Sequence, residues 1–485
     1  MRIRAGVLNV GMRERGYPYI PNSVPEVKRA MLREVGVEDE SELYEEVPER
    51  LRLPGALKLP EPIEDEHAIR RHVERILARN RNCRDAVSFL GAGCAQHFVP
   101  AVVDEVVGRG EFLTCYGAET WADHGKHQAF FEYQSMIAEL VDQDFLTVPT
   151  YDGPNAMAAA IGIANRLTGR RRILLPASLS PEALSVIRLF AASNQRQEEL
   201  DVELVAFDRA TGLLDLDDLR RKLSPDVAAV LIENPTFLGG IETGALEIGR
   251  LAKAAGAEFI VHVDPISLGV LEAPANYGAR MTTGDLHDLG LHLSAGSGQG
   301  GFVTTPDEER YLWETRELVS SLTATTVPDE MGFGLCMIER THYAQREKGK
   351  EFTGTGVNLW AIASGAYLAL MGPQGMREVG EAIMQNAQYA ARRLAAIPGV
   401  RLGLAGPFFK EFVLNYDGSG WSAAEVQAAL LEHGIFAGLD LTRDFPELGQ
   451  SALYCVTEVH EKADIDALVA ALRGILEGPR PEIDR

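Results

Sequence analysis

One segment contains several side chains of the types that often carry out acid–base chemistry: residues 116–128, YGAETWADHGKHQ. Together with the nearby TYDGPN run, this loop supplies six candidate site residues: Tyr116, Glu119, His124, Lys126, His127 and Tyr151. His124 or His127 would suit proton transfer near neutral pH, with Glu119 as a further acid–base group. Lys126 would suit binding of a substrate carboxylate. Each residue taken alone is more often a solvated loop side chain, but loops that combine these types more often serve sites.

A second chemical signal is the acid that ends a strongly apolar run, EFIVHVD, at Asp264. A buried strand ending in an acid, followed by a Gly/Ser-rich loop, is typical of the cofactor half of pyridoxal-phosphate (PLP) enzymes, where the acid pairs with the pyridinium nitrogen. The chain has no lysine between Lys253 and Lys348, so the expected Schiff-base lysine is missing. This favours the alternative, in which Asp264 caps the following PISLG turn through backbone amides.

The TYDGPN run predicts a helix that begins near Pro154. The N-terminus of such a helix would suit a cofactor phosphate. Asp152, however, stands at the cap and would repel a dianion. We therefore expect Asp152 to form an ordinary N-cap hydrogen bond.

The elements that position these residues follow from the pattern of residues 150–265. Four apolar, partly β-branched runs alternate with helical segments; the runs are RRILLPA, VELVAFD, VAAVLIEN and EFIVHVD. This pattern predicts a parallel sheet covered on both faces. Ligands bind such sheets at the carboxyl ends of the strands, so the segments after Ala177, Asn234 and Asp264 are where we expect a site.

The rest of the chain predicts three regions: an N-terminal helical arm (1–85), a large α/β domain (86–375) and a small C-terminal α+β domain (376–485) with an antiparallel sheet. The arm helices carry narrow apolar stripes, so we expect them to clasp another domain or subunit. The FLGAG run lacks the third glycine of a dinucleotide fingerprint and predicts a tight turn. Residues 306–400 are expected to be mainly helical.

Composition excludes several function classes. With 485 residues and a net charge of -23, the chain is expected to bind neither nucleic acid nor anionic membranes. Its five cysteines are scattered and form no CxxC pair, which disfavours structural zinc and disulfides and fits a cytoplasmic location. No apolar run is long enough to cross a membrane.

Several runs together resemble one family. They include YPYIPNS, FLGAG with HFVP, FEYQSMIAEL, TYDG, ENPTFLGGIE, VDPISLG, GPFFKEFVLN and VTEVH, between about Tyr19 and Leu476. The chain resembles the alpha chain (subunit 1) of the two-subunit glycine cleavage system P-proteins, which are fold-type I PLP enzymes. The resemblance implies a PLP-transferase-like large domain that lacks its Schiff-base lysine.

The resemblance also implies a function and partners. PLP would be held covalently by a homologous lysine-bearing beta subunit in an α2β2 assembly, and not by this chain. The reaction would decarboxylate glycine and pass the aminomethyl group to the lipoyl arm of H-protein. In this setting Tyr116 and Tyr151 would contact the cofactor, His124, His127 and Glu119 would be catalytic, and Lys126 would bind the substrate. A Schiff base on Lys126 itself is disfavoured, because this residue does not follow a strand of the sheet.

The chain departs from the family in several polar loops, which leaves alternatives open. The departures are at 116–128, at Ser180 where the family has histidine, at 350–358 and at the SAGSGQGG run. Because function follows site residues and not the fold, a related PLP-dependent decarboxylase or lyase subunit acting on another small amino acid is one alternative. A catalytically silent scaffold subunit is the other.

Overall fold

The computed structural model describes residues 20–55, 57–63, 65–113, 124–146, 149–192, 199–294, 300–315, 319–335 and 357–478. The chain divides into two compact units, residues 1–80 and 81–485. The three-region division, with boundaries after residues 85 and 375, stays a proposal. None of the described helices combines the length and the hydrophobicity that crossing a bilayer requires.

The first unit contains two helices, as its sequence predicts. Helix α1 (Pro25–Val35) has proline at its start and ends at Gly36, whose φ of 88° is left-handed. Helix α2 (Glu66–Leu77) is capped by Asp65. The intervening SELYEEVPERL run forms only the short 3-10 turns Glu40–Tyr44 and Glu49–Leu51. Neither α-helix buries a residue, and their association with another domain or subunit stays a prediction.

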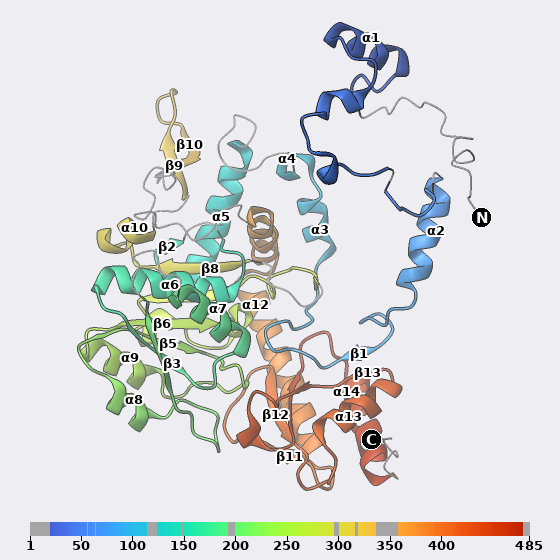
Figure 1. The fold of residues 1–485 in the computed structure, drawn as a ribbon. Helices are drawn as coiled ribbons and strands as arrows, with labels where there is room; N and C mark the ends of the chain where they lie inside the picture. The colour runs from blue at the N-terminus through green and yellow to red at the C-terminus, as the bar shows by residue number, and fades with distance from the viewer. Residues whose placement is uncertain are drawn as a thin grey trace. The chain divides into compact units, whose positions relative to one another are not determined.

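The second unit is built on a seven-stranded sheet (Figure 1). In spatial order its strands are β2 (Phe145–Leu146), β8 (Gly301–Thr305), β7 (Met281–Asp285), β6 (Glu258–Val263), β5 (Val227–Glu233), β3 (Arg172–Pro176) and β4 (Asp201–Val205). Strands β7, β6, β5, β3 and β4 run parallel to one another, whereas β8 pairs antiparallel with both β7 and β2. All four predicted strands are present, and the predicted, mainly parallel sheet is confirmed.

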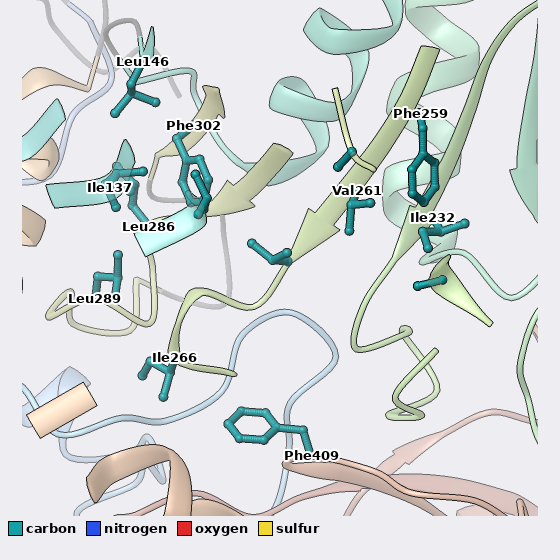
Figure 2. Packing of buried hydrophobic residues seen from close by; sticks show 14 of the residues in the cluster. Ile137, Leu146, Ile232, Phe259, Val261, Ile266, Leu286, Leu289, Phe302 and Phe409 are labelled. Atoms are coloured by element: carbon teal, nitrogen blue, oxygen red, sulfur yellow. The ribbon is translucent and has the colours of Figure 1, made fainter. Parts of the chain in front are cut away.

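Both faces of this sheet are covered, because alternate residues of its central strands enter different cores. Val230 and Ile232 of β5 join one cluster, and Ala229 and Leu231 join the other. Figure 2 shows part of the first cluster, which includes Ile232, Phe259 and Val261. That cluster takes in α5 (His124–Val141), α9 (Ala245–Ala254) and α12 (Asn358–Ala395), and the other takes in α6 (Gly153–Thr168) and α7 (Pro181–Ala192). Shorter helices complete the layers: α3 (Ala101–Val107), α4 (Gly110–Leu113), α8 (Leu216–Lys222) and α10 (Glu309–Thr315).

The expectation of a mainly helical 306–400 region is wrong for its first part. Strands β9 (Ser320–Ala324) and β10 (Met331–Leu335) form an antiparallel hairpin. The physical reason lies in the local residue types, since the two serines and the threonine of β9 and the two glycines of β10 are poor helix formers. The second part is helical, and α12 leaves helical geometry at Gly372 (φ 58°), just before Pro373.

The predicted small α+β region is also confirmed. It contains an antiparallel sheet in the order β11 (Arg401–Leu402), β12 (Glu411–Asn415), β15 (Ser451–Cys455) and β14 (Leu439–Asp440). Helices α13 (Ala423–Glu432) and α14 (Lys462–Glu477) pack with it, and β1 (Val87–Ser88) pairs with β13 (Ile435–Phe436). The start of β12 is important for the site. Lys410, directly before this strand, and Glu411, its first residue, lie beside the carboxyl ends of strands of the large sheet.

Candidate functional site

A cavity of about 150 Å³ lies at the carboxyl ends of the parallel strands. Its walls include residues that follow β3, β5, β6 and β7, together with the turn at Ala92–Cys94 and residues 409–411 before and at the start of β12. The segments after Ala177, Asn234 and Asp264, where the sequence predicts a site, all contribute to the walls of this cavity. The FLGAG turn is also confirmed, because Cys94 N donates to Gly91 O at 3.2 Å.

Asp264 caps the turn after β6, as the sequence predicts. Its Oδ1 accepts hydrogen bonds from the backbone amides of Ile266 (2.9 Å) and Ser267 (3.4 Å). Its other oxygen, Oδ2, lies 2.8 Å from the ammonium nitrogen of Lys410. The acid that would face a pyridinium in a PLP enzyme is therefore already paired with a positive charge of this chain.

Lys410 is the centre of a buried charge cluster. Its Nζ also donates to Asp288 Oδ2 at 2.6 Å and lies 3.3 Å from the ring of His97. His97 in turn lies 2.9 Å from Glu458 through Nδ1 and 3.4 Å from Asp288 through Nε2. Phe409, just before Lys410, packs in the core of the large domain and anchors this segment (Figure 2).

Asp288 and Lys410 hold each other ionised, whereas burial keeps the pKa of Asp264 above its usual range although Lys410 opposes this shift. Burial alone would raise the pKa of Asp288, but the positive charges of Lys410 and His97 hold it well below its usual range. Burial likewise opposes protonation of Lys410, yet Asp264 and Asp288 raise its pKa well above the ordinary value. A lysine with a raised pKa is a poor nucleophile, so Lys410 is suited to charge pairing and not to Schiff-base formation.

The N-terminus of α6 is occupied by carboxylates. Asp152 is the N-cap, as predicted, and its Oδ1 accepts from Asn155 N at 2.7 Å. Asp285, at the end of β7, accepts from Gly153 N at 3.1 Å and from His287 N at 2.8 Å. The backbone amides that would bind a phosphate therefore already face negatively charged or acidic groups.

Three further acids in the cavity wall have perturbed acidity. Burial raises the pKa of Glu233 to about 8, and it raises those of Asp285 and Glu411 to about 7. The neighbouring carboxyls add to these shifts, since Glu411 acts on Glu233 and Asp288 acts on Asp285. Burial also lowers the pKa of His262 to about 3, so this ring is neutral.

These residues do not fit PLP. Among the described residues that line the cavity, Lys410 is the only lysine or arginine, and it is paired with two aspartates. The helix terminus that would receive the phosphate carries Asp152 and Asp285. A pyridinium at Asp264 would have to displace the Lys410 ammonium. In the part of the chain that the structure describes, none of the three contacts that hold the cofactor in fold-type I enzymes is therefore available to PLP.

The six site residues predicted from the sequence either lie outside the described residues or lie away from this cavity. Tyr116 and Glu119 lie outside the described residues, and so does the side chain of His124, which begins α5. Lys126 and His127 follow in the first turn of α5 and are buried, so they are not solvated loop residues. Tyr151 is 39% exposed. The three described side chains do not line the cavity.

Sequence reasoning missed the titratable residues of the cavity wall and of the charge cluster around Lys410: His97, Glu233, Asp285, His287, Asp288, Lys410, Glu411 and Glu458. A signal was present, because Lys410 and Glu411 directly precede the apolar FVLNY strand, and charges at the edge of a buried strand need partners. The partners themselves lie more than 120 positions away in sequence, and only the fold identifies them.

Comparison with known proteins agrees with this architecture. Residues 18–472 match the family model of the glycine cleavage system P-protein. A probable glycine dehydrogenase (decarboxylating) subunit 1 from Moorella thermoacetica is 38% identical, covering 94% of this chain and 99% of that protein. The same subunit from Staphylothermus marinus is 35% identical over 95% of this chain and 98% of the relative.

Solved structures give the same result. The crystal structure of a glycine decarboxylase (P-protein) of the glycine cleavage system in inhibitor-bound form is 33% identical, with a TM-score of 0.82, and the match covers 94% of this chain and 99% of that one. A sphingosine-1-phosphate lyase from Burkholderia pseudomallei shares the fold at 16% identity and a TM-score of 0.64. The fold is that of the fold-type I PLP-dependent enzymes, and the chain belongs to the glycine cleavage system P-protein family.

Proposed function

We propose that this chain is the lysine-less subunit of a two-subunit glycine dehydrogenase (decarboxylating). A homologous partner subunit holds PLP covalently through its own lysine, and two copies of each subunit form an α2β2 assembly in the cytoplasm. The assembly decarboxylates glycine and transfers the aminomethyl group to the lipoyl arm of H-protein. PLP supplies the electron sink for this chemistry, and this chain completes the site around it.

The main support for the proposal is the ion pair between Lys410 and Asp264, which lies in a cavity whose residues do not fit PLP. A chain of this family without its own cofactor site needs a partner that has one. The names of the two relatives as subunit 1 support the same conclusion. They also favour glycine over another small amino acid, and an enzyme subunit over a silent scaffold.

The contribution of this chain is proposed to come from α5 and the segment that precedes it. Lys126 binds the glycine carboxylate, and His127, His124 and Glu119 hold or move protons. Tyr116 and Tyr151 contact the cofactor held by the partner. Support comes from the burial of Lys126 and His127 at the start of α5, which places two of the predicted residues inside the protein and not in solvent.

Reconstitution tests the proposed function. The chain alone is expected to show no PLP absorbance and no exchange of labelled CO2 into glycine, and both are expected to appear after co-expression with a lysine-bearing homologue. PLP absorbance in the isolated chain that disappears in Lys126→Ala would overturn the cofactor assignment. CO2 exchange into another amino acid but not glycine would support a related decarboxylase or lyase subunit with a different substrate. Inactivity with all amino acids tested would support a catalytically silent scaffold subunit.

Substitutions in α5 separate the proposed roles in the reconstituted enzyme. Lys126→Met is expected to raise the KM for glycine by about tenfold with little change in kcat, because it removes binding common to ground and transition states. His127→Gln is expected to lower kcat by about 10²-fold, because it removes a proton-transfer group.

The matched control is Gln128→Ala on the exposed side of the same helix, where the side chain of Gln128 donates to Glu132 at 2.9 Å. This control should leave both constants unchanged. Equal losses in all three variants, or loss of assembly on size-exclusion chromatography, would indicate that α5 acts structurally.

A further inference from the structure

The hairpin of β9 and β10 has one apolar face. In this antiparallel pair Leu322 lies opposite Phe333, and Ala324 lies opposite Met331. Because successive side chains of a strand point to opposite faces, these four side chains share one face of the hairpin. The other face carries small and polar residues, among them Thr323. A two-stranded hairpin of this kind is stable only when its apolar face packs against another element.

The inner part of this face packs on α5. The ring centroid of Phe333 lies 5.5 Å from that of Phe131 in α5. The backbone amide of Ser320, at the start of β9, donates to the side-chain oxygen of buried Gln134 at 3.1 Å. Phe131 follows His127 by about one turn of the same helix. The hairpin is therefore fixed to the helix that begins with the proposed site residues.

The outer part of the face is open to solvent. Leu322 and Met331, which are diagonal neighbours on the two strands, are 49% and 58% exposed. Val327, in the connecting turn, is 53% exposed. Single exposed apolar residues are common on any protein surface, but a set gathered on one element marks an interaction site. The hairpin therefore presents a surface that suits another protein.

The turn between the strands is ordered by contacts within the hairpin. Glu330 N donates to Val327 O at 3.3 Å, and Thr325 N donates to Glu330 O at 3.2 Å. Pro328 and Asp329 occupy the central positions of this turn, and Asp329 has a left-handed φ of 64°. Proline suits the first of these positions, and aspartate tolerates the left-handed conformation. A preformed element loses little conformational entropy on binding, which favours a docking role.

The position of the hairpin selects its occupant. The turn of the hairpin and the beginning of α5 lie at the same end of the second unit (Figure 1). Under the proposed function, Lys126 and His127 at the start of α5 reach the cofactor that the lysine-bearing partner subunit holds. A partner that brings its cofactor to the start of α5 must also lie close to the surface that adjoins this helix, and the open apolar face is continuous with it through Phe333.

We propose that the apolar face of the β9–β10 hairpin docks on the lysine-bearing partner subunit, with Leu322 and Met331 as its outermost contacts. The identity of this occupant rests on the proposed function. Asp329 and Glu330 are exposed at the turn, so the matching surface of the partner is apolar and carries a cation beside it. Docking at this place holds the partner against the start of α5.

Binding of the separately purified lysine-bearing homologue to the full-length chain, measured by bio-layer interferometry, tests this surface. Leu322→Gln combined with Met331→Gln is expected to raise the Kd by about 30-fold, because two apolar contacts are lost. Thr323→Gln, on the opposite face of the same hairpin, is the matched control and should change the Kd by less than about twofold. Leu246→Gln removes an equally exposed leucine from α9 and should also leave the Kd unchanged.

Hydrogen exchange of the parent chain gives a second readout that requires no variant. The backbone amides of residues 321–334 are expected to exchange at least about tenfold more slowly when the partner is bound. Unchanged exchange, or an unchanged Kd in a double variant that melts like the parent chain, would overturn the proposal. A dimer of the chain alone that the double variant dissociates would also overturn it, because the occupant would then be a second copy.

Failure of this inference can be told apart from failure of the proposed function, because binding and glycine turnover are measured separately. Parent subunits that bind through the hairpin but exchange no CO2 into glycine would contradict the proposed function alone. Active subunits whose Kd does not respond to the double variant would contradict the docking surface alone.

Discussion

Replacement of Lys410 by methionine is expected to lower the free energy of unfolding by about 3–5 kcal/mol, as found when one partner of a buried ion pair is removed. The ammonium lies 2.8 Å from Asp264 and 2.6 Å from Asp288, and all three side chains are almost fully shielded from water. Methionine fills a similar volume but leaves buried Asp264 without its ion-pair partner and Asp288 with His97 alone. Urea unfolding followed by tryptophan fluorescence measures the change.

Two comparisons make this result specific. Lys462→Met removes an exposed lysine that pairs with Asp466, and it is expected to leave the free energy of unfolding nearly unchanged, because solvent screens exposed ion pairs. Lys410→Met combined with Asp264→Asn and Asp288→Asn should recover much of the lost stability, because the uncompensated charges are then gone. An effect of Lys410→Met no larger than that of Lys462→Met would contradict the buried cluster.

The loss of stability in Lys410→Met should also depend on pH. The direction of this dependence follows from the pKa values of Asp264 and Asp288. In the parent chain Lys410 and His97 hold the pKa of Asp288 below its usual range, so their stabilisation is present above about pH 4 and fades below it. In Lys410→Met the two acids have raised pKa values, which cost stability increasingly as the pH rises above 4. The difference between the two proteins should therefore be large at pH 7 and small near pH 4.

Gly239→Ala is expected to destabilise the chain by about 3 kcal/mol or more, through two effects that act together. Gly239 has a left-handed φ of 91°, and an added Cβ would lie 2.0 Å from the carbonyl oxygen of Glu411. The backbone at Gly239 and just after it is hydrogen-bonded to the same segment, since Phe409 N donates to Gly239 O at 3.3 Å and Ile241 N donates to Pro407 O at 2.9 Å. The substitution must therefore displace Lys410 and Glu411.

Gly93→Ala is the matched control, because Gly93 has the same φ of 91° but no atom within 4 Å of an added Cβ. It should cost only the backbone strain, about 1 kcal/mol. Thermal and urea unfolding of both variants give the comparison. Equal losses of stability in Gly239→Ala and Gly93→Ala would mean that the close approach of Gly239 to Glu411 does not contribute to the effect.

Much of the large domain was predictable from local pattern. The strands that end at Asp264 and Glu233 are continuous apolar runs, and such runs between helical segments require a sheet with two covered faces. The caps at Asp152 and Asp264 were predictable for a similar reason, since they depend on backbone amides two or three residues away. The hairpin at 320–335 was not predicted, because short strands rich in glycine and threonine carry a weak periodic signal.

The sequence by itself determined the mainly parallel sheet, its carboxyl-end site, the capping aspartates and the lack of a Schiff-base lysine at the expected place. Only the tertiary structure decided how that place is filled. Lys410 meets Asp264 and Asp288 from positions 146 and 122 residues apart along the chain, because β12 of the small sheet starts beside the carboxyl ends of β6 and β7. Local residue preferences act over a few positions, whereas a buried charge takes its partners from whichever segments the fold brings within about 3 Å.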